Sequence, residues 1–148
     1  FEVIGTPGGV TVVEDYAHNA GKVTALVRTA VELVGADHVH VVFQPHLFSR
    51  TRDFAEGFGA GLAAASDVVL LPIYGAREDP MPGVTSELVA KAVRRHNPKA
   101  QVEVEADRAA VVAGLVARSR PGDLVLIVGA GDVTTMAPLV LAALGAQP

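Results

Sequence analysis

Short apolar runs alternate along this chain with longer segments in which apolar residues recur at helical spacing. The clearest run, "LVLIV" at 124–128, has no polar position and is typical of a strand that is covered on both faces. Strands joined by helices form right-handed crossovers, which place the strands parallel in one sheet. The sequence therefore predicts a single α/β domain, Rossmann-like, with a mostly parallel sheet of about six strands and helices on both faces.

The expected elements follow from the two periodicities. Strands are predicted at 10–15, 38–44, 67–73 and 101–105 and at the apolar run within 122–132, with 1–4 as a further edge strand. Helices are predicted from about Val23 to Gly35, from Arg50 through Leu62, from a Thr or Ser cap at Thr85 to Arg95, after a cap at Asp107, and from the last strand to about Leu144. Pro72 cannot donate to a ladder, so we expect it at a strand end or a bulge.

Length and composition exclude several classes of function. The chain has 148 residues, 50% of them hydrophobic, which suits one compact domain over 1–148. A formal charge of −4 gives no bulk attraction to nucleic acid or to anionic membranes, and a chain without cysteine has no disulfide or thiolate metal site. No apolar run reaches the roughly 18 residues that span a bilayer. We expect a soluble domain without nucleic-acid or membrane partners. Because the chain begins with Phe1 and not Met, we expect it to be part of a longer protein.

Ligands of parallel sheets bind beyond the carboxyl ends of the strands, and two of those loops carry unusual side chains. In "EDYAHNAGKV", Asp15 is placed to accept hydrogen bonds from ribose hydroxyls beside a helix start that favours anions. The alternative is that Asp15 or Asn19 only caps the next helix, while Tyr16 and His18 pack locally.

The second loop, "FQPHLFSRTRDF", places cations where a helix is expected to begin. His46, Arg50 and Arg52 lie at a helix amino terminus, where the helix dipole disfavours positive charge. Such cations indicate an anionic ligand, and a guanidinium matches a carboxylate or phosphate, so we expect a small acid substrate here. The alternative is a solvated basic turn paired with Asp53 or Glu56.

Other motifs carry less chemistry. "GAGDVT" at 129–134 lacks the third glycine of a dinucleotide-binding turn, so it predicts only a tight strand-to-helix connection. No G-x-x-x-x-G-K-[ST] loop occurs, so the chain alone does not cradle a triphosphate in the usual way. His38, His40 and His96 are interpreted as structural or exposed residues, and no metal site is expected. The loop at 74–83 shows no readable chemical role.

Four segments together resemble the carboxy-terminal domain of the Mur ligases: "EDYAHNAGKV", "VVFQPHLFSRTRDF", "DVVLLPIYGARE" and "GDLVLIVGAGDV". The resemblance runs in register over nearly the whole chain. The D-Y-A-H turn is shared across the family, whereas F-Q-P-H-x-[FY]-[ST]-R-[ST]-[RK] resembles the alanine-adding branch. The resemblance implies that an amino-terminal UDP-sugar domain and a central ATPase domain precede this one in the full-length protein.

The resemblance also implies a reaction. The full-length enzyme would join L-alanine to UDP-N-acetylmuramate through an acyl phosphate, with ATP and Mg²⁺ held mainly by the central domain, in the cytoplasmic phase of peptidoglycan synthesis. The resemblance implies that this domain closes over the nucleotide and positions the amino acid, while the central domain supplies nearly all of the positioning and metal electrostatics on which phosphoryl transfer depends. The isolated domain is expected to be inactive and to contain no catalytic residue.

Site residues follow from the resemblance, position by position. It implies ATP-binding residues Asp15 and His18 and amino-acid-binding residues Tyr16, His46, Arg50 and Arg52. Arg50 would pair with the amino-acid carboxylate, and Leu47 stands where some members have arginine, so Arg52 is a second candidate for that contact. Asn19 stands where members often have histidine. We expect Asp15 and Arg50 to face a common hollow.

Two other hypotheses compete with this one. The chain could belong to a sister ligase that adds another amino acid or a peptide, or it could be a stand-alone nucleotide-binding or interaction module without catalysis. Phosphate release with alanine, compared with release with other amino acids, distinguishes the alanine-adding ligase from a sister ligase. A G-K-[ST] loop upstream on the same polypeptide argues against a stand-alone module.

Overall fold

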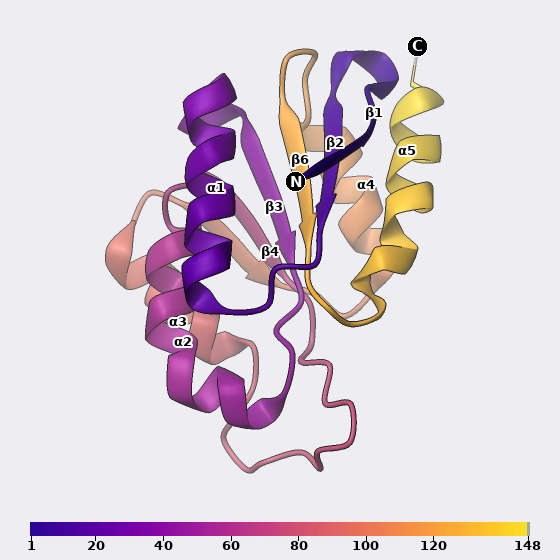
Figure 1. Cartoon of the computed structure of the whole chain (residues 1–148). Coiled ribbons are helices and arrows are strands. Elements are labelled where there is room, and N and C mark those ends of the chain that lie inside the picture. The colour runs from indigo at the N-terminus through magenta and orange to yellow at the C-terminus, as the bar shows by residue number, and fades with distance from the viewer. Residues whose placement is uncertain (148) are drawn as a thin grey trace.

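Six strands form one sheet in the spatial order β1-β2-β6-β3-β4-β5 in the computed structural model, which describes residues 1–147 (Figure 1). The strands are β1 (Glu2–Gly5), β2 (Thr11–Asp15), β3 (Val39–Phe43), β4 (Asp67–Leu70), β5 (Gln101–Val104) and β6 (Leu124–Val128). β1 is antiparallel to β2, and all other neighbours pair in parallel. The predicted mostly parallel sheet and its edge strand are confirmed.

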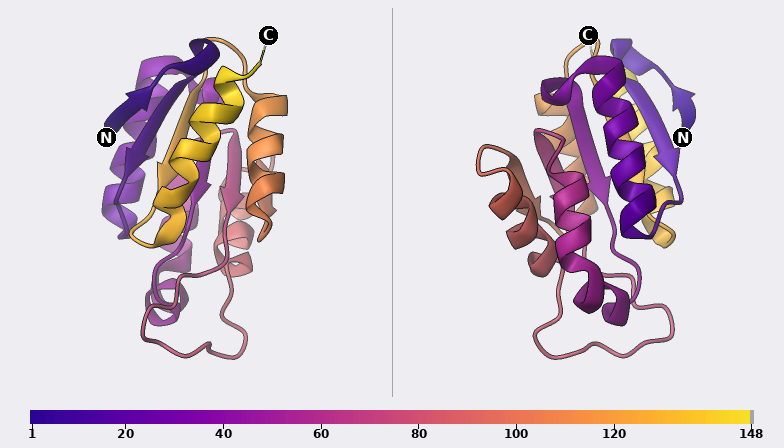
Figure 2. Two further views of the ribbon diagram at one scale, coloured as in Figure 1. Left: turned by 90° about the vertical axis from the view of Figure 1, so that its right-hand side faces the viewer. Right: turned by 60° about the vertical axis from the view of Figure 1, so that its left-hand side comes forward.

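Helices cover both faces of the sheet, as predicted. They are α1 (Ala20–Val34), α2 (Phe48–Leu62), α3 (Glu87–His96), α4 (Arg108–Arg118) and α5 (Met136–Gly145). α1, α2 and α3 pack on one face and α4 and α5 on the other, as the two views in Figure 2 show. Short 3₁₀ turns at Pro7–Gly9, Ala36–His38 and Asp132–Thr135 complete the chain.

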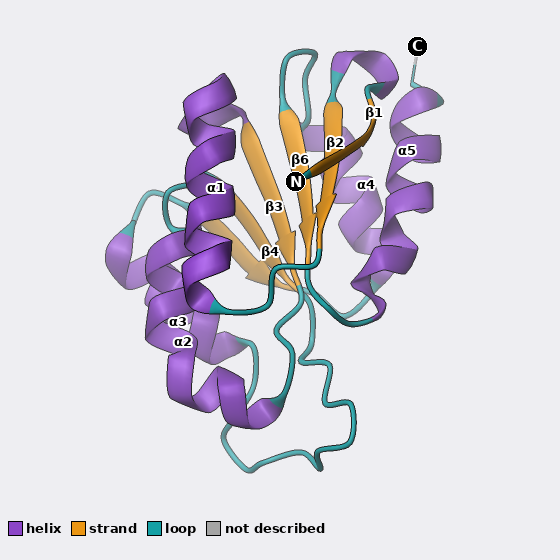
Figure 3. Cartoon of the chain, viewed as in Figure 1, coloured by secondary structure: helices purple, strands orange, loops and turns teal. Residues whose placement is uncertain are grey.

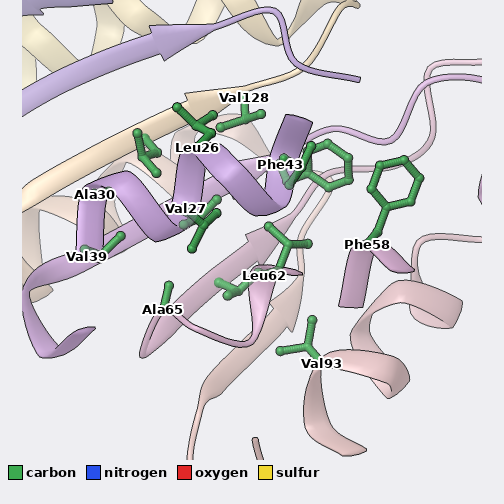
Figure 4. Packing of buried hydrophobic residues seen from close by; sticks show 14 of the residues in the cluster. Leu26, Val27, Ala30, Val39, Phe43, Phe58, Leu62, Ala65, Val93 and Val128 are labelled. Atoms are coloured by element: carbon green, nitrogen blue, oxygen red, sulfur yellow. The ribbon is translucent and has the colours of Figure 1, made fainter. Parts of the chain in front are cut away.

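The core is split by the sheet into two layers that follow the alternation of strand side chains. In β3, Val41 and Phe43 face α1, α2 and α3, whereas Val42 faces α4 and α5. Phe43 packs against Phe58 of α2 with ring centroids 5.2 Å apart (Figure 4). All residues of β3 and β6 are buried, which explains the unbroken apolar run of β6.

The carboxyl ends of the parallel strands meet at one edge of the sheet, where the longest loop projects (Figure 3). β6 lies between β2 and β3, so the "GAGD" turn sits between the two polar loops. β4 ends at Leu70, three residues earlier than predicted, and Pro72 follows just past its end. α2 begins at Phe48, two residues before the predicted start, which puts Arg50 inside the first helical turn.

A buried ionic cluster joins the amino ends of three strands at the opposite edge. The two ring nitrogens of His40 lie 2.6 Å from Asp67 and 2.8 Å from Asp123, and Arg118 donates to Asp67 at 2.8 Å. Carboxylates only accept, so both His40 nitrogens donate and the ring is an imidazolium. Burial opposes this charge, but hydrogen bonds to and attraction by Asp67 and Asp123 outweigh burial and raise the pKa of His40. The structural interpretation of His40 is confirmed.

Within residues 1–147, no helix is both long and apolar enough to cross a bilayer.

Candidate functional site

The turn between β2 and α1 is held by two side chains that bond to its backbone. Asp15 accepts the N–H of Ala17 at 2.8 Å and also contacts the amine of Phe1. Asn19 accepts the N–H of Lys22 at 2.9 Å, so the capping interpretation is confirmed for Asn19. Both residues therefore brace the turn, and any ligand contact of Asp15 comes in addition to this role.

The side chains of Tyr16 and His18, on this same turn, lie in different environments. The Tyr16 residue is 63% exposed, while its carbonyl oxygen lies 3.1 Å from Nδ1 of His18. This contact holds the His18 ring close to its own turn, and the ring lies edge-to-face with that of His46 on the next loop, with centroids 6.2 Å apart. The structure thus brings His18 toward the second loop and leaves Tyr16 in solvent.

The turn between β3 and α2 is clamped by Tyr74 of the loop that follows β4. Tyr74 N–H donates to the Pro45 carbonyl at 2.9 Å, and Leu47 N–H donates to the Tyr74 carbonyl at 2.8 Å. Leu47 has φ +72°, a left-handed conformation that costs energy for a residue other than glycine. The clamp on both sides maintains this conformation, which directs the chain into α2.

A cluster forms above this turn from His18, His46, Arg50 and Tyr74, here called the His46 cluster. The rings of His46 and Tyr74 stack with centroids 5.8 Å apart at 15°. Nη1 of Arg50 lies 3.5 Å from Nδ1 of His46. Three loops thus contribute to one cluster at the carboxyl edge of the sheet.

The charges of the His46 cluster suit an anion. Burial first, and then the charges of Arg50 and His18, lower the pKa of His46 in spite of the opposing charge of Glu78. A neutral His46 ring accepts from the guanidinium of Arg50, which can only donate. Among the described residues, no carboxylate forms an ion pair with Arg50. The guanidinium therefore keeps donors available for a carboxylate.

Arg52 behaves differently from Arg50 on the same helix. It bonds to Asp53 at 2.9 Å on an exposed surface, as in the paired-turn alternative. Glu56 instead bonds to Arg95 and His96 of α3. The alternative pairing thus describes Arg52 and not Arg50, and the expected assistance from Arg52 stays a prediction.

The prediction that Asp15 and Arg50 face a common hollow is wrong for this domain. Arg50 lines a pocket of about 220 Å³ with Phe54, the cap residue Asn19 and the first two residues of α1. Asp15 lines a separate pocket of about 290 Å³ with Ala17 and residues further along α1. The first turn of α1 contributes to both pockets. The Asp15 carboxylate accepts the Ala17 N–H of its own turn.

A third pocket of about 330 Å³ lies beside Tyr74 and is lined by Gln44, Arg108 and Asp132 among others. Asp132 accepts from Gln44 at 2.7 Å and from Arg108 at 2.8 Å. A Cβ at Gly131 would lie 2.6 Å from both Gln44 Oε1 and Tyr74 Cγ, so only glycine fits. The "GAGD" segment is a tight connection, as predicted, and it supports Gln44 and Tyr74.

Comparison with known proteins identifies the family. The Mur ligase, glutamate ligase domain, matches residues 1–131. The chain belongs to the Mur ligase family. Its similarity is high to the UDP-N-acetylmuramate–L-alanine ligases of Kineococcus radiotolerans (54% identity over 141 residues, 95% of this chain and 30% of that protein) and Saccharopolyspora erythraea (50% over 143 residues, 96% and 29%). The chain thus spans about 30% of the length of these curated relatives.

Solved structures of Mur ligases share the fold. The UDP-N-acetylmuramate-alanine ligase of Thermotoga maritima superposes with a TM-score of 0.72 at 19% identity, covering 96% of this chain and 29% of that one. A murein peptide ligase from Psychrobacter arcticus gives a TM-score of 0.77 at 18% identity, covering 99% and 30%. These superpositions support the open α/β fold that the sequence predicted.

The sequence patterns missed three contributors to this region. Tyr74 and Glu78 belong to a loop without a readable role, and no pattern singled out Arg108. The position of Asp132 just after a strand was a usable signal, because the carboxyl edge of a parallel sheet is where such side chains gather. No comparable signal existed for Glu78, which reaches the site from a long loop.

Proposed function

We propose that this chain is the carboxy-terminal domain of a cytoplasmic, ATP-dependent ligase that joins L-alanine to UDP-N-acetylmuramate in peptidoglycan synthesis. The observation that carries the proposal is 54% identity to a UDP-N-acetylmuramate–L-alanine ligase over 95% of the chain. An amino-terminal UDP-sugar domain and a central ATPase domain complete the proposed enzyme.

The role proposed for this domain is to hold the amino acid. Arg50 donates to the alanine carboxylate, and the neutral His46 ring beside it orients the guanidinium without adding a second positive charge. Holding a small amine in position for attack on an acyl phosphate removes roughly 7 kcal/mol or more of entropic barrier. Tyr16 and Arg52, both on the exposed side of this region, are proposed as outer contacts of the amino acid.

ATP and Mg²⁺ fit this domain only in part. Asp15 stands at the carboxyl end of β2, where a carboxylate suits ribose hydroxyls, and His18 lies on the same turn. Among residues 1–147, no group of three or more His, Cys, Asp or Glu side chains gathers in a metal-binding arrangement. We therefore assign Mg²⁺ and the phosphates to the central domain and the ribose to Asp15. ATP supplies the phosphoryl group that activates the muramate carboxylate.

Phosphate release by the full-length protein that contains this chain tests the proposal. With ATP, Mg²⁺ and UDP-N-acetylmuramate present, L-alanine is expected to support phosphate release, while D-glutamate, meso-diaminopimelate and a murein tripeptide are not. This chain alone is expected to release none. Preference for a tripeptide or for another amino acid would assign the chain to a sister ligase, and absence of release with every amine would favour a non-catalytic module.

A further inference from the structure

The helix that carries Arg50 lacks a cap of its own. α1 is capped by Asn19 and α4 by Asp107, each through a side chain that accepts backbone N–H groups. The corresponding position of α2 is Leu47, which has no capping side chain, and the first turn of α2 contains no acidic residue. The first turn instead carries Arg50, a charge that the helix dipole disfavours. The amino end of α2 therefore needs an acceptor from elsewhere.

Glu78 supplies that acceptor from the loop between β4 and α3. Its Oε1 accepts the N–H of Ser49 at 3.0 Å, and its Oε2 accepts the Ser49 hydroxyl. These two bonds, with a smaller contribution from the N–H of Phe48, lower the pKa of Glu78. The carboxylate is thus ionised at neutral pH and places a negative charge where the dipole favours one.

The same loop also fixes the backbone just before α2. Tyr74 clamps Pro45 and Leu47 through its backbone, and its ring stacks on His46. Figure 1 shows this loop running beneath the start of α2 at the carboxyl edge of the sheet. Tyr74 and Glu78 are therefore two attachments of one loop, the first to the turn and the second to the helix.

We propose that Glu78 is a positioning residue of the amino-acid subsite, which caps α2 from the neighbouring loop and so fixes Arg50 and His46 for the substrate carboxylate. This inference rests on the proposed function. Glu78 itself bonds to Ser49, one residue before Arg50, and acts on the substrate only through that turn. The polar loop "YGARED" thereby acquires a role that its composition does not show.

The test compares variants of the full-length enzyme. Glu78→Ala is expected to raise the KM for L-alanine roughly two- to thirtyfold, the range that corresponds to loss of a helix cap, while the KM for ATP changes less than twofold. Glu78→Gln keeps an acceptor oxygen without the charge and is expected to fall between wild type and Glu78→Ala. Glu87→Gln is the matched control, because Glu87 is an exposed acid that bonds to Arg94 on α3. It is expected to leave both KM values unchanged.

Amide hydrogen exchange in the full-length enzyme distinguishes a failure of the helix cap from a failure of the positioning role. In Glu78→Ala, which removes the acceptor, exchange at Ser49 is expected to rise, while exchange at Lys22, which Asn19 protects, is expected to stay constant. Faster exchange at Ser49 with an unchanged KM for alanine would overturn the positioning role. Unchanged exchange at Ser49 would overturn the cap. A wild-type enzyme that is inactive with alanine would refute the proposed function whatever the exchange result, and the positioning role with it.

Discussion

Two histidines of this chain take opposite charge states because of their neighbours. His40 lies between the carboxylates of Asp67 and Asp123 at one edge of the sheet, and its pKa is raised. His46 lies at the other edge beside Arg50, and its pKa is lowered. The ordinary value of both groups is 6.5, so burial alone would push both pKa values down. Burial therefore lowers the pKa of His46 with help from Arg50 and His18, whereas the two carboxylates reverse the effect of burial at His40.

The buried ionic cluster of His40, Asp67, Asp123 and Arg118, here called the His40 cluster, predicts how stability depends on pH. Because the pKa of His40 is higher in the folded chain, its contribution is fully present below about pH 6.5 and is lost as pH rises through the folded value. Each tenfold difference in proton affinity corresponds to about 1.4 kcal/mol. Urea unfolding from pH 6 to 9 is expected to show a falling free energy of unfolding, and NMR titration is expected to place His40 above 6.5 and His46 below it.

The control for this experiment is His96→Gln, since His96 is an exposed partner of Glu56 on the surface. It is expected to leave the pH slope unchanged, whereas His40→Gln removes the slope. Asp67 and Asp123 act in the opposite range, because their lowered pKa values withdraw stability only as pH falls below about 3.8. A slope above pH 6.5 that persists in His40→Gln would contradict the assignment.

At the scale of elements, α2 is fixed by close contact with α3. A Cβ at Gly59 would lie 2.2 Å from the Ala92 Cβ and 2.8 Å from the backbone nitrogen of Val93. Glycine at this position lets the two helices approach, although glycine lowers helix propensity. The packing of α2 against α3 affects the candidate site, because α2 carries Arg50.

Replacing Gly59 with alanine tests whether helix propensity or the clash with α3 has the larger effect on stability. Helix propensity alone predicts that Gly59→Ala stabilises the chain by about 1 kcal/mol. The clash with backbone atoms of α3 predicts a loss of about 1–3 kcal/mol, so we expect net destabilisation in urea unfolding. Gly145→Ala at the end of α5 is the control, because the nearest atom to its Cβ would be Pro7 Cβ at 3.7 Å, an ordinary contact, and it is expected to stabilise. Equal stabilisation by both substitutions would contradict this account.

Periodicity predicted every strand and helix of the fold, because apolar positions of period 2 and of helical spacing report directly on burial. It did not place the start of α2, since the acceptor for that helix is Glu78, which is distant in sequence. Nor could it reveal that β6 lies between β2 and β3, because strands buried on both faces look alike in sequence.

Residue types predicted part of the candidate site. Cations at a helix start indicated Arg50 and His46, which do lie together. The pattern could not show that Arg52 turns to Asp53, or that Asp15 and Arg50 line separate pockets. Those outcomes depend on side-chain partners and on where α1 begins, which neither spacing nor composition determines.

At the scale of the whole molecule, the sheet places the buried ionic cluster at one edge and the candidate site at the opposite edge. The His40 cluster joins the amino ends of β3, β4 and β6, while the His46 cluster, "GAGD" and the Tyr74 loop gather at the carboxyl ends. The chain spans about 30% of the length of its curated relatives, and we propose that this carboxyl edge faces the central domain of the full-length protein.

The kinetics of Arg50→Ala in the full-length enzyme test the central claim most directly. Loss of a charged hydrogen bond to the carboxylate is expected to raise the KM for L-alanine roughly ten- to hundredfold, with the KM for ATP changing less than twofold. Arg95→Ala, which removes an exposed arginine of α3, is expected to change neither constant. An unchanged KM for alanine in Arg50→Ala, or equal rises for alanine and ATP, would contradict the account.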